Sequence, residues 1–507
     1  MLPLAELKGF AREGARMLAA ERDLAQFELY CSSAEQLVMR LNYTSEIPSR
    51  GVEECKSLAA DGFAIRIAMR RNPHEVGAAF IAGDLSAAAL REALLRARRA
   101  AVIDPHFSGL PGDPHRAAAA SGGASDLVRA GTAQIVDAAW RIVGGAIDAF
   151  RADGPRGDHP HGLVLGGDIL VTRDRFAVAN SNLARIRAEQ GACFSSSATA
   201  IVESLDARAT ASAVGASSAE LRRMAPRLGR EAVHRALALG AGAEVAPGRH
   251  RVLLGPQPVA EILCYLMVPS LTTGAFQAVN SAYQGRFGER VMDARLSLVD
   301  EPAGRGRAIA RRLTCEGLPA RRTELVRDGR VVGLLSNFYD AHRLAGDEHR
   351  SEKLGPHAPR KLEFPARNGY RLGEGGGRRF DSMPATAATN VVMRARGGVG
   401  ERELIAAVRD GIYVGRIWYT YPINGQRAGD FTCTITGDSY LIRNGRIAAP
   451  LRPNRLRINA HLDEVFGAPL AVGRRIVPVT VWGSPEIYYV PAVAAAGLDL
   501  SAVGAAG

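Results

Sequence analysis

Lysine is almost missing from this sequence, because only Lys8, Lys56, Lys353 and Lys361 stand among its 64 basic residues. Arginine supplies the rest, a bias that codon composition explains more simply than a binding partner does. The formal net charge is +12, yet the basic residues are spread along the chain. Nucleic-acid binding needs basic residues gathered on one face with aromatic residues between them. The composition therefore argues against nucleic acid as a partner.

Long hydrophobic runs are also missing. No apolar stretch approaches the roughly 18 residues that a membrane helix needs, so no transmembrane helix and no membrane partner are expected. The first residues, MLPLAELKGFAREGARML, contain Glu6 and Glu13 and follow a helical pattern. They lack the charged-then-apolar order of a signal peptide. We therefore expect a cytoplasmic protein.

Cysteine pairs of the kind that bind metal or form a disulfide framework are absent. The six cysteines are scattered and include no CxxC pair. Most of them lie in apolar runs, so we interpret them as small buried hydrophobic residues. They stand at positions 31, 55, 193, 264, 315 and 433.

Recognisable catalytic motifs are missing too. None of the eleven histidines belongs to an HExxH or HExxxH sequence, in which a helix offers two metal ligands and a glutamate base. Gly-x-Ser-x-Gly and a P-loop are absent as well. His159-Pro-His161 is interrupted by proline in a glycine-rich stretch, and we interpret it as a solvated loop. No residue of this chain is therefore predicted to be catalytic or to bind a metal.

What the sequence does have is enough length for two or three domains with sizeable cores, because it holds 507 residues. Short strand-like runs and helical patterns in the first half predict an N-terminal α/β domain with a mixed sheet over residues 1–240. Strand-like runs dominate the second half and predict a β-rich, sandwich- or barrel-like domain over residues 241–507. The expected fold class of the whole chain is α+β.

Periodicity and capping residues set the expected elements of the N-terminal domain. Polar residues at Ser32–Ser33 and around 172–174 are interpreted as turns, each separating two strands. Helices are expected over residues 1–27, 85–101 (with Ser86 as N-cap), 126–152 and 217–240. Strands are expected over residues 27–41 (divided by the turn), 62–69, 77–82, 163–171, 175–180 and parts of 185–204.

In the C-terminal domain, residues 323–335 alternate around Asp328-Gly329, which predicts a β-hairpin. Residues 346–388 are irregular, rich in glycine and arginine, and poor in acidic residues. Long irregular loops inside compact domains are usually functional or disordered. Two interpretations of this segment stay open: a substrate-facing flap with positive potential, or a mobile solvated loop.

The stretch from Gly248 to Pro302 carries the strongest pattern. A short apolar run is broken by glycine and proline, and residues 259–268 then form an apolar stretch in which Glu261 is the one charged residue. Proline near its start and apolar residues on almost every face predict a buried helix. The sequence S-x-x-x-G-x-x-G-E follows over residues 281–289, and a second strand-like run closes with Asp300-Glu301-Pro302.

This order resembles the TldD/PmbA family of peptidases. Two later passages are similar to the same family: EGxPxRxTxLxxxGxxxGxL, which begins at Glu316, and NGQRAGDFT, which spans Asn424–Thr432. The resemblance covers nearly the whole chain and is strongest from residue 248 to 465. It implies a fold in which a β-rich C-terminal domain carries the active-site cleft.

The resemblance implies one of two kinds of subunit. The TldD kind carries HExxxH on the buried helix and holds zinc, whereas the PmbA (TldE) kind has the same scaffold without that motif. Laid on the TldD helix, the motif falls near Cys264, Tyr265 and Pro269, none of which supplies the same chemistry. The TldD kind also takes a thiolate near its C-terminus, and the last cysteine here is Cys433. The expected cofactor is therefore none in this chain, with zinc in a TldD-like partner.

The leading hypothesis is a metal-free partner subunit of a TldD/TldE-type metallopeptidase, which is not catalytic by itself. It would form a dimer with a TldD-like subunit or with a second copy of itself, and act in proteolysis of unfolded or small peptides, including leader-bearing ones. Substrate would bind as an extended strand. The residues expected to contact it are Cys264, Tyr265, Tyr283, Asn390, Asp430 and Phe431.

Two alternatives stay open. One is a stand-alone enzyme on the same scaffold, with a rebuilt non-zinc site in which Tyr265, Tyr283, Asp430 and the basic flap supply acid, base and anion-binding groups. The other is a homodimeric peptide-binding protein.

Overall fold

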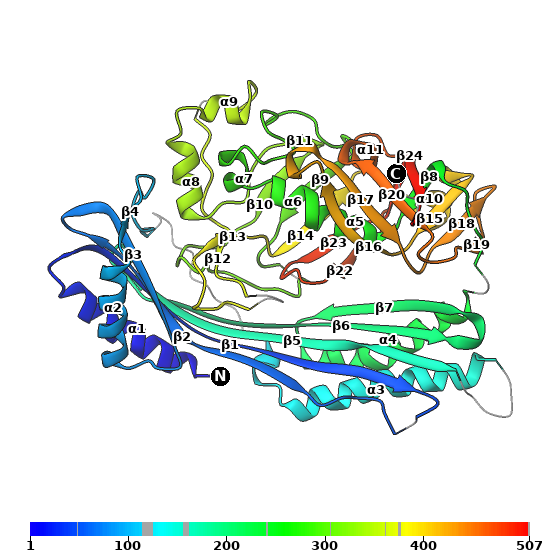
Figure 1. The fold of residues 1–507 in the computed structure, drawn as a ribbon, viewed down its shortest axis with the longest axis horizontal. Helices are drawn as coiled ribbons and strands as arrows, with labels where there is room; N and C mark the ends of the chain where they lie inside the picture. Colours follow the sequence, from blue (N-terminus) through cyan, green and yellow to red (C-terminus); the bar gives the residue numbers. More distant parts are fainter. Residues whose placement is uncertain are drawn as a thin grey trace.

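Figure 1 shows the computed structural model, which describes residues 1–47, 49–113, 125–155, 162–239, 242–304, 306–359, 361–373 and 377–504. The class is α+β, as predicted. The N-terminal half forms one long sheet with helices on one face, and the C-terminal half lies over the other face. Every helix in the described ranges is too short or too polar to cross a membrane. The cytoplasmic location stays a prediction.

The N-terminal sheet has seven strands in the order β4-β3-β2-β1-β5-β6-β7. Its strands are β1 (Leu24–Thr44), β2 (Lys56–Met69), β3 (Asn72–Ala82), β4 (Val102–Ile103), β5 (Leu163–Asn180), β6 (Arg187–Val202) and β7 (Ala207–Gly215). The α-helices of this half are α1 (Leu4–Ala19), α2 (Ala87–Arg99), α3 (Thr132–Asp153) and α4 (Ser218–Leu237). Every pairing in the sheet is antiparallel, so the expected mixed sheet is wrong.

Both predicted turns inside long strands are also wrong. β1 runs through Ser32 and Ser33, which pair with Gly62 and Asp61, and β5 runs without a break from Leu163 to Asn180. The polar residues that suggested turns are buried on the sheet, where they face other protein groups instead of solvent. Asp174 of β5, for example, binds an arginine of the C-terminal half.

The helix starts predicted from capping residues agree with the structure more closely than the predicted turns do. Ser86 accepts a hydrogen bond from the Ala89 N–H at 3.1 Å, and α2 begins at the next residue. Ser217 and Glu220 form a capping box at the start of α4. The predicted strand pair 62–69 and 77–82 is confirmed as β2 and β3. The predicted first helix is too long, since α1 ends at Ala19.

The C-terminal half contains two large sheets, and neither closes into a barrel. The six-stranded sheet has the order β11 (Arg330–Val331), β10 (Thr323–Arg327), β9 (Leu296–Asp300), β14 (Asn390–Ala395), β23 (Ile487–Val490) and β22 (Val477–Thr480). The nine-stranded sheet has the order β16 (Ile417–Ile423), β17 (Asp430–Ile435), β20 (Leu456–His461), β24 (Val493–Ala502), β8 (Gly248–Leu254), β15 (Gly411–Val414), β18 (Tyr440–Arg443) and β19 (Arg446–Pro450), with β21 (Ala471–Val472) beside β24. The predicted hairpin around Asp328-Gly329 is confirmed as β10 and β11.

The buried helix predicted over residues 259–268 lies between these two sheets. It consists of α5 (Pro256–Ile262), a π-helical turn η3 (Leu263–Met267) and α6 (Val268–Ser270). α5 contacts β22 and β23 of one sheet and β8 and β16 of the other. A helix with sheets on two sides needs apolar residues around most of its circumference, which explains its composition.

The remaining helices lie around the two sheets. They are α7 (Thr273–Gln277), α8 (Phe338–Ala345), α9 (Arg350–Leu354), α10 (Glu401–Val408) and α11 (Leu462–Phe466). A two-stranded sheet pairs β12 (Gly369–Tyr370) with β13 (Ala385–Thr386). The predicted domain boundary after residue 240 and the His159-Pro-His161 sequence lie outside the described residues, so both stay predictions.

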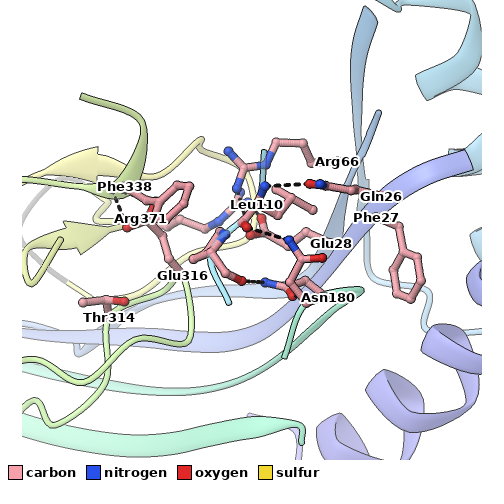
Figure 2. A network of polar contacts seen from close by, with 12 residues as sticks. Gln26, Phe27, Glu28, Arg66, Leu110, Asn180, Thr314, Glu316, Phe338 and Arg371 are labelled. Carbon is pink, nitrogen blue, oxygen red and sulfur yellow. Dashed lines mark hydrogen bonds and ion pairs between the residues drawn. The ribbon is translucent and has the colours of Figure 1, made fainter. Parts of the chain in front are cut away.

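A buried ionic cluster joins the two halves of the chain (Figure 2). Glu28 of β1 is 0% exposed and binds Arg66 of β2 at 2.9 Å and Arg371, which follows β12, at 2.8 Å. The Arg371 guanidinium also stacks over the ring of Tyr30 at 4.8 Å. Glu316 lies beside these charges and accepts a hydrogen bond from the Phe338 N–H.

A second arginine of the same segment makes a parallel contact. Arg378 is 1% exposed, and its Nε donates to Asp174 at 2.8 Å. It also pairs with Glu189 of β6 and stacks over Phe176 at 4.6 Å. The segment 346–388 is therefore held on the N-terminal sheet by two arginines whose charges are neutralised, and these two do not contribute the positive potential that the flap interpretation expected.

Replacing Arg371 by methionine should destabilise the protein. The substitution leaves Glu28 buried with one partner instead of two, and breaking a buried ion pair in this way costs about 3–5 kcal/mol in the free energy of unfolding. Urea unfolding followed by fluorescence measures the loss. The control is Arg96→Met, because Arg96 and its partner Glu92 are 57% and 55% exposed and such surface pairs contribute about 0–1 kcal/mol. Equal losses for the two variants would show that the cluster does not stabilise the fold.

Candidate functional site

A cleft of about 910 Å³ lies between the N-terminal sheet and the C-terminal half. One wall is the uncovered face of the seven-stranded sheet, and the opposite wall comes from α5, β16, β22 and the loop that follows β22. The sheet wall is rich in small polar side chains. They are Asp168, Ser195, Ser196, Ser197, Thr199, Thr210 and Ser212.

The edge strands of all three large sheets meet at this cleft. β7 is an edge of the seven-stranded sheet, β16 of the nine-stranded sheet and β22 of the six-stranded sheet. Each contributes lining residues, such as Thr210 from β7, Trp418 from β16 and Thr480 from β22. An edge strand has backbone groups that can pair with an added strand. The arrangement therefore suits an extended peptide.

Aromatic side chains line one side of the cleft. Trp418 and Trp482 both belong to its lining, and their ring centroids are 5.9 Å apart. Trp482 is 74% exposed, and Tyr419 beside Trp418 is 70% exposed. Large exposed aromatic residues are common anchors for peptides and protein partners.

Three carboxyl groups of the cleft, those of Asp168, Glu261 and Glu486, have pKa values that burial raises. Glu261 of α5 is 4% exposed and accepts a hydrogen bond from the Thr420 hydroxyl at 2.8 Å and another from Gln257. Burial nevertheless raises the pKa of Glu261 to about 7. Burial also raises the pKa of Glu486, which accepts a hydrogen bond from Ser484. Carboxyl groups that titrate near neutral pH in a cleft are candidates for acid–base chemistry.

None of the six residues expected to contact substrate belongs to the lining of the cleft, but Cys264 and Tyr265 contact the lining residues Ser484 and Trp482. The Tyr265 hydroxyl donates to the Trp482 carbonyl at 2.9 Å. Desolvation raises the pKa of the Cys264 thiol to about 11, although Tyr488 donates a hydrogen bond to it. A thiol with so high a pKa is protonated and weakly nucleophilic at neutral pH.

The other four expected residues do not line the cleft. Tyr283 and Phe431 are buried in the C-terminal core. Asn390 is fully buried, and its side-chain amide donates to the carbonyls of Glu301 and Ile309 at 2.7 and 2.9 Å. Asp430 begins β17, outside the lining of the cleft. In this structure Tyr283, Asn390 and Phe431 stabilise the fold, because a ligand in the cleft cannot reach them.

The geometry of the π-helical turn determines which positions of this helix could bind one metal ion together. The Val268 N–H donates to the carbonyl of Leu263, five residues earlier. Such a turn brings residues five apart, such as Cys264 and Pro269, toward the same side of the helix. HExxxH spaces its two histidines by five residues, so the backbone suits that motif. The side chains do not match it, because a single cysteine replaces the first histidine and a proline, whose ring offers zinc no donor atom, replaces the second.

The rest of the described chain offers no replacement. Within the described ranges, no group of three or more histidine, cysteine, aspartate and glutamate side chains is placed to hold a metal ion.

Sequence analysis missed Glu486, Trp418, Trp482 and the role of Glu261. Glu261 left a signal, since it is the one charge in an otherwise apolar helix. The other three did not, because each comes from a strand or loop whose position depends on the packing of two sheets.

Residues 247–499 match the family described as the PmbA/TldA metallopeptidase C-terminal domain. This chain belongs to the TldD/PmbA family. No curated protein matches the chain.

Solved structures share the fold of this TldD/PmbA-family protein over almost its whole length. TldE from Thermococcus kodakarensis matches with a TM-score of 0.77 at 14% identity, covering 98% of this chain and 100% of its own. Proteins described as modulators of DNA gyrase from Thermotoga maritima and Bacteroides thetaiotaomicron each match with a TM-score of 0.72. Their identities are 14% and 17%; this chain is covered to 98% in both cases, and theirs to 100% and 99%. At these identities the likeness concerns the fold alone, which is that of PmbA/TldE-like metallopeptidases.

Glu261→Gln should flatten part of the dependence of stability on pH. The pKa of Glu261 is about 7 in the folded chain against an ordinary value of 4.5. Between these values the unfolded chain has lost a proton that the folded chain keeps, so the free energy of unfolding falls as pH rises and levels off above about 7. At 1.36 kcal/mol per pKa unit, Glu261 accounts for ~3 kcal/mol of this fall.

Urea unfolding at pH 4 to 8 tests this expectation. Glu316 and Asp300, whose pKa values burial raises to about 7 and about 6, act in the same direction. They are present in both proteins, so the difference between variant and parent isolates Glu261. Glu92→Gln, at an exposed position, serves as the control. Parallel curves for Glu261→Gln and its parent would contradict a raised pKa.

Proposed function

We propose that this chain is the partner subunit of a TldD/TldE-type metallopeptidase and does not itself hold the catalytic zinc. One observation carries the proposal: the helix between the two sheets keeps a turn that suits HExxxH, yet Cys264, Tyr265 and Pro269 stand at the corresponding positions. The complex as a whole would act in proteolysis, and this chain would supply part of the surface that holds the substrate.

The proposed substrate is an extended peptide, either unfolded or small, with leader-bearing peptides as one class. Three edge strands border the cleft, which supports recognition through backbone hydrogen bonds with weak dependence on sequence. The small polar side chains of the sheet wall can accept or donate hydrogen bonds to a peptide backbone. A folded protein would not enter a cleft of about 910 Å³.

The proposed partner is a TldD-like subunit that carries HExxxH, with a second copy of this chain as the other possibility. Exposed aromatic residues on the edge strand β16 support a protein partner on this side. Tyr419 and Tyr421 are 70% and 47% exposed, and tyrosine is enriched in protein interfaces. A homodimer without enzymatic activity would correspond to the peptide-binding alternative.

A second candidate function is a stand-alone enzyme with a non-zinc site. The raised pKa values of Glu261 and Glu486 in the same cleft favour it, because two such carboxyl groups can act as acid and base. The side chains expected from sequence to supply acid, base and anion-binding groups, Tyr265, Tyr283 and Asp430, do not support it, since none of them belongs to the lining of the cleft.

The isolated chain should not cleave peptides, with or without added zinc. Cleavage should require a TldD-like subunit from the same organism that carries HExxxH, and should disappear when both histidines of that subunit are replaced by alanine. Mass spectrometry of an unstructured peptide after incubation measures the activity. Turnover by the isolated chain that falls by about a hundredfold or more in Glu261→Gln would support the second candidate and overturn the first.

Trp482→Ala should weaken peptide binding by roughly tenfold, because an exposed aromatic anchor of a cleft contributes about 1–2 kcal/mol. Fluorescence anisotropy of a labelled unstructured peptide measures the affinity, with the TldD-like subunit present if the isolated chain binds too weakly. Trp140→Ala is a matched control, because Trp140 is also exposed but belongs to α3 on the helix-covered face of the sheet (Figure 1). Equal effects of the two substitutions would exclude the cleft as the binding site.

A further inference from the structure

A small cavity of about 50 Å³ adjoins the cleft. The two share Thr172, Cys193, Ile309 and Pro485 as wall residues, so the cavity is a side pocket of the cleft. A space of about 10–15 Å³ admits one water molecule. The pocket therefore has room for a group of three or four heavy atoms, which is the size of a carboxylate.

Arg311 lines this pocket and is only 6% exposed. Its Nη1 atom is buried without a hydrogen-bond partner. Within the described ranges, no carboxylate lies within ion-pair distance of its guanidinium, which lies over the ring of Tyr370 at 5.1 Å from the centroid. A buried charge without a partner is costly, so proteins rarely keep one that has no ligand.

The other buried arginines make the contrast clear. Arg371 binds Glu28, and Arg378 binds Asp174 and Glu189. The nearby carboxylates are consequently occupied. Asp174 accepts three hydrogen bonds from Arg378, and Glu189 accepts one from Arg378 and one from the Arg312 N–H.

Glu486 is the remaining acidic group near Arg311. Burial raises the pKa of Glu486, whereas the charge of Arg311 lowers it; the Glu486 side chain accepts the Ser484 hydroxyl and forms no ion pair with Arg311 in the described structure. The pocket thus presents a guanidinium whose donors no described acidic side chain satisfies.

We propose that Arg311 is a binding residue for a carboxylate group of the peptide in the cleft. A guanidinium can donate two parallel hydrogen bonds to a carboxylate, and this geometry fits a pocket too small for a larger anion. The carboxylate is either the C-terminus of the peptide or an acidic side chain. This inference depends on the proposed function only in assigning the carboxylate to a peptide, because the pocket would bind a carboxylate whatever the function of the chain.

The first test uses acetate and needs no peptide. Sodium acetate at constant ionic strength should raise the melting temperature of the parent protein above its value in sodium chloride, because a ligand that binds the folded state stabilises it. Arg311→Met should lose this shift and should melt, without acetate, at the parent temperature or above it. Arg402→Met, at an exposed position of α10, should keep the shift. An equal acetate shift in the parent and in Arg311→Met, or none in the parent, would overturn the inference.

The second test identifies the source of the carboxylate. Labelled peptides are compared as free acid against C-terminal amide, and with glutamate against glutamine inside the sequence, in the parent and in Arg311→Met. A tenfold or greater preference for one acidic form that disappears in Arg311→Met supports the inference and names the source. An acetate shift without binding of any peptide would support the pocket and overturn peptide binding. Peptide binding that ignores both changes and Arg311→Met would overturn the pocket and leave the proposed function standing.

Discussion

Arg371 and Arg378 come from one irregular segment, and both are 1% exposed. Arg371 binds one carboxylate of the N-terminal sheet, Arg378 binds two, and each guanidinium stacks on an aromatic ring of the same sheet. The position of the C-terminal half over the sheet depends on these contacts. These buried ion pairs tolerate little displacement, because a shift of a few ångströms would leave the guanidinium and its carboxylate buried and unpaired. The cleft lies between these two layers, and the segment that carries the arginines contributes Leu372, Gly373 and Arg379 to its lining.

The same contacts explain which parts of the fold could be predicted. Helix ends at Ser86 and Ser217 depend on neighbouring residues, and the sequence indicates them correctly. β1 and β5 could not be predicted as single long strands, because Ser32 and Asp174 read as turn residues until a second layer covers them. The buried helix was predictable from its apolar composition, whereas its π-helical turn was not. Local pattern predicts elements well where their partners are local or apolar, and poorly where distant polar groups are buried together.

The residues of the candidate site also fall into those that the sequence could predict and those that it could not. The family resemblance pointed to a helix that contributes Gln257 and Glu261 to the cleft, whereas Cys264 and Tyr265 of the same helix are not in its lining. Tyr283 and Asn390 were expected from the sequence to contact substrate, but both are buried and stabilise the fold. Trp482, Glu486 and Arg311 come from loops whose positions depend on sheet packing, so no spacing rule could find them. Functional residues on such loops are found only when the cleft is seen.

The π-helical turn has a consequence for engineering. Turns of this kind are rare because their hydrogen bonds are longer and their interior is less well packed, and they are frequent at functional sites. Here the altered backbone is already built between two sheets, while the side chains at 264, 265 and 269 are not the two histidines and the glutamate of HExxxH. Installing a metal centre in this chain would therefore be a matter of exchanging side chains on an existing frame. The difficult part of such a design, a helix whose ligand positions five residues apart share one side, is already present.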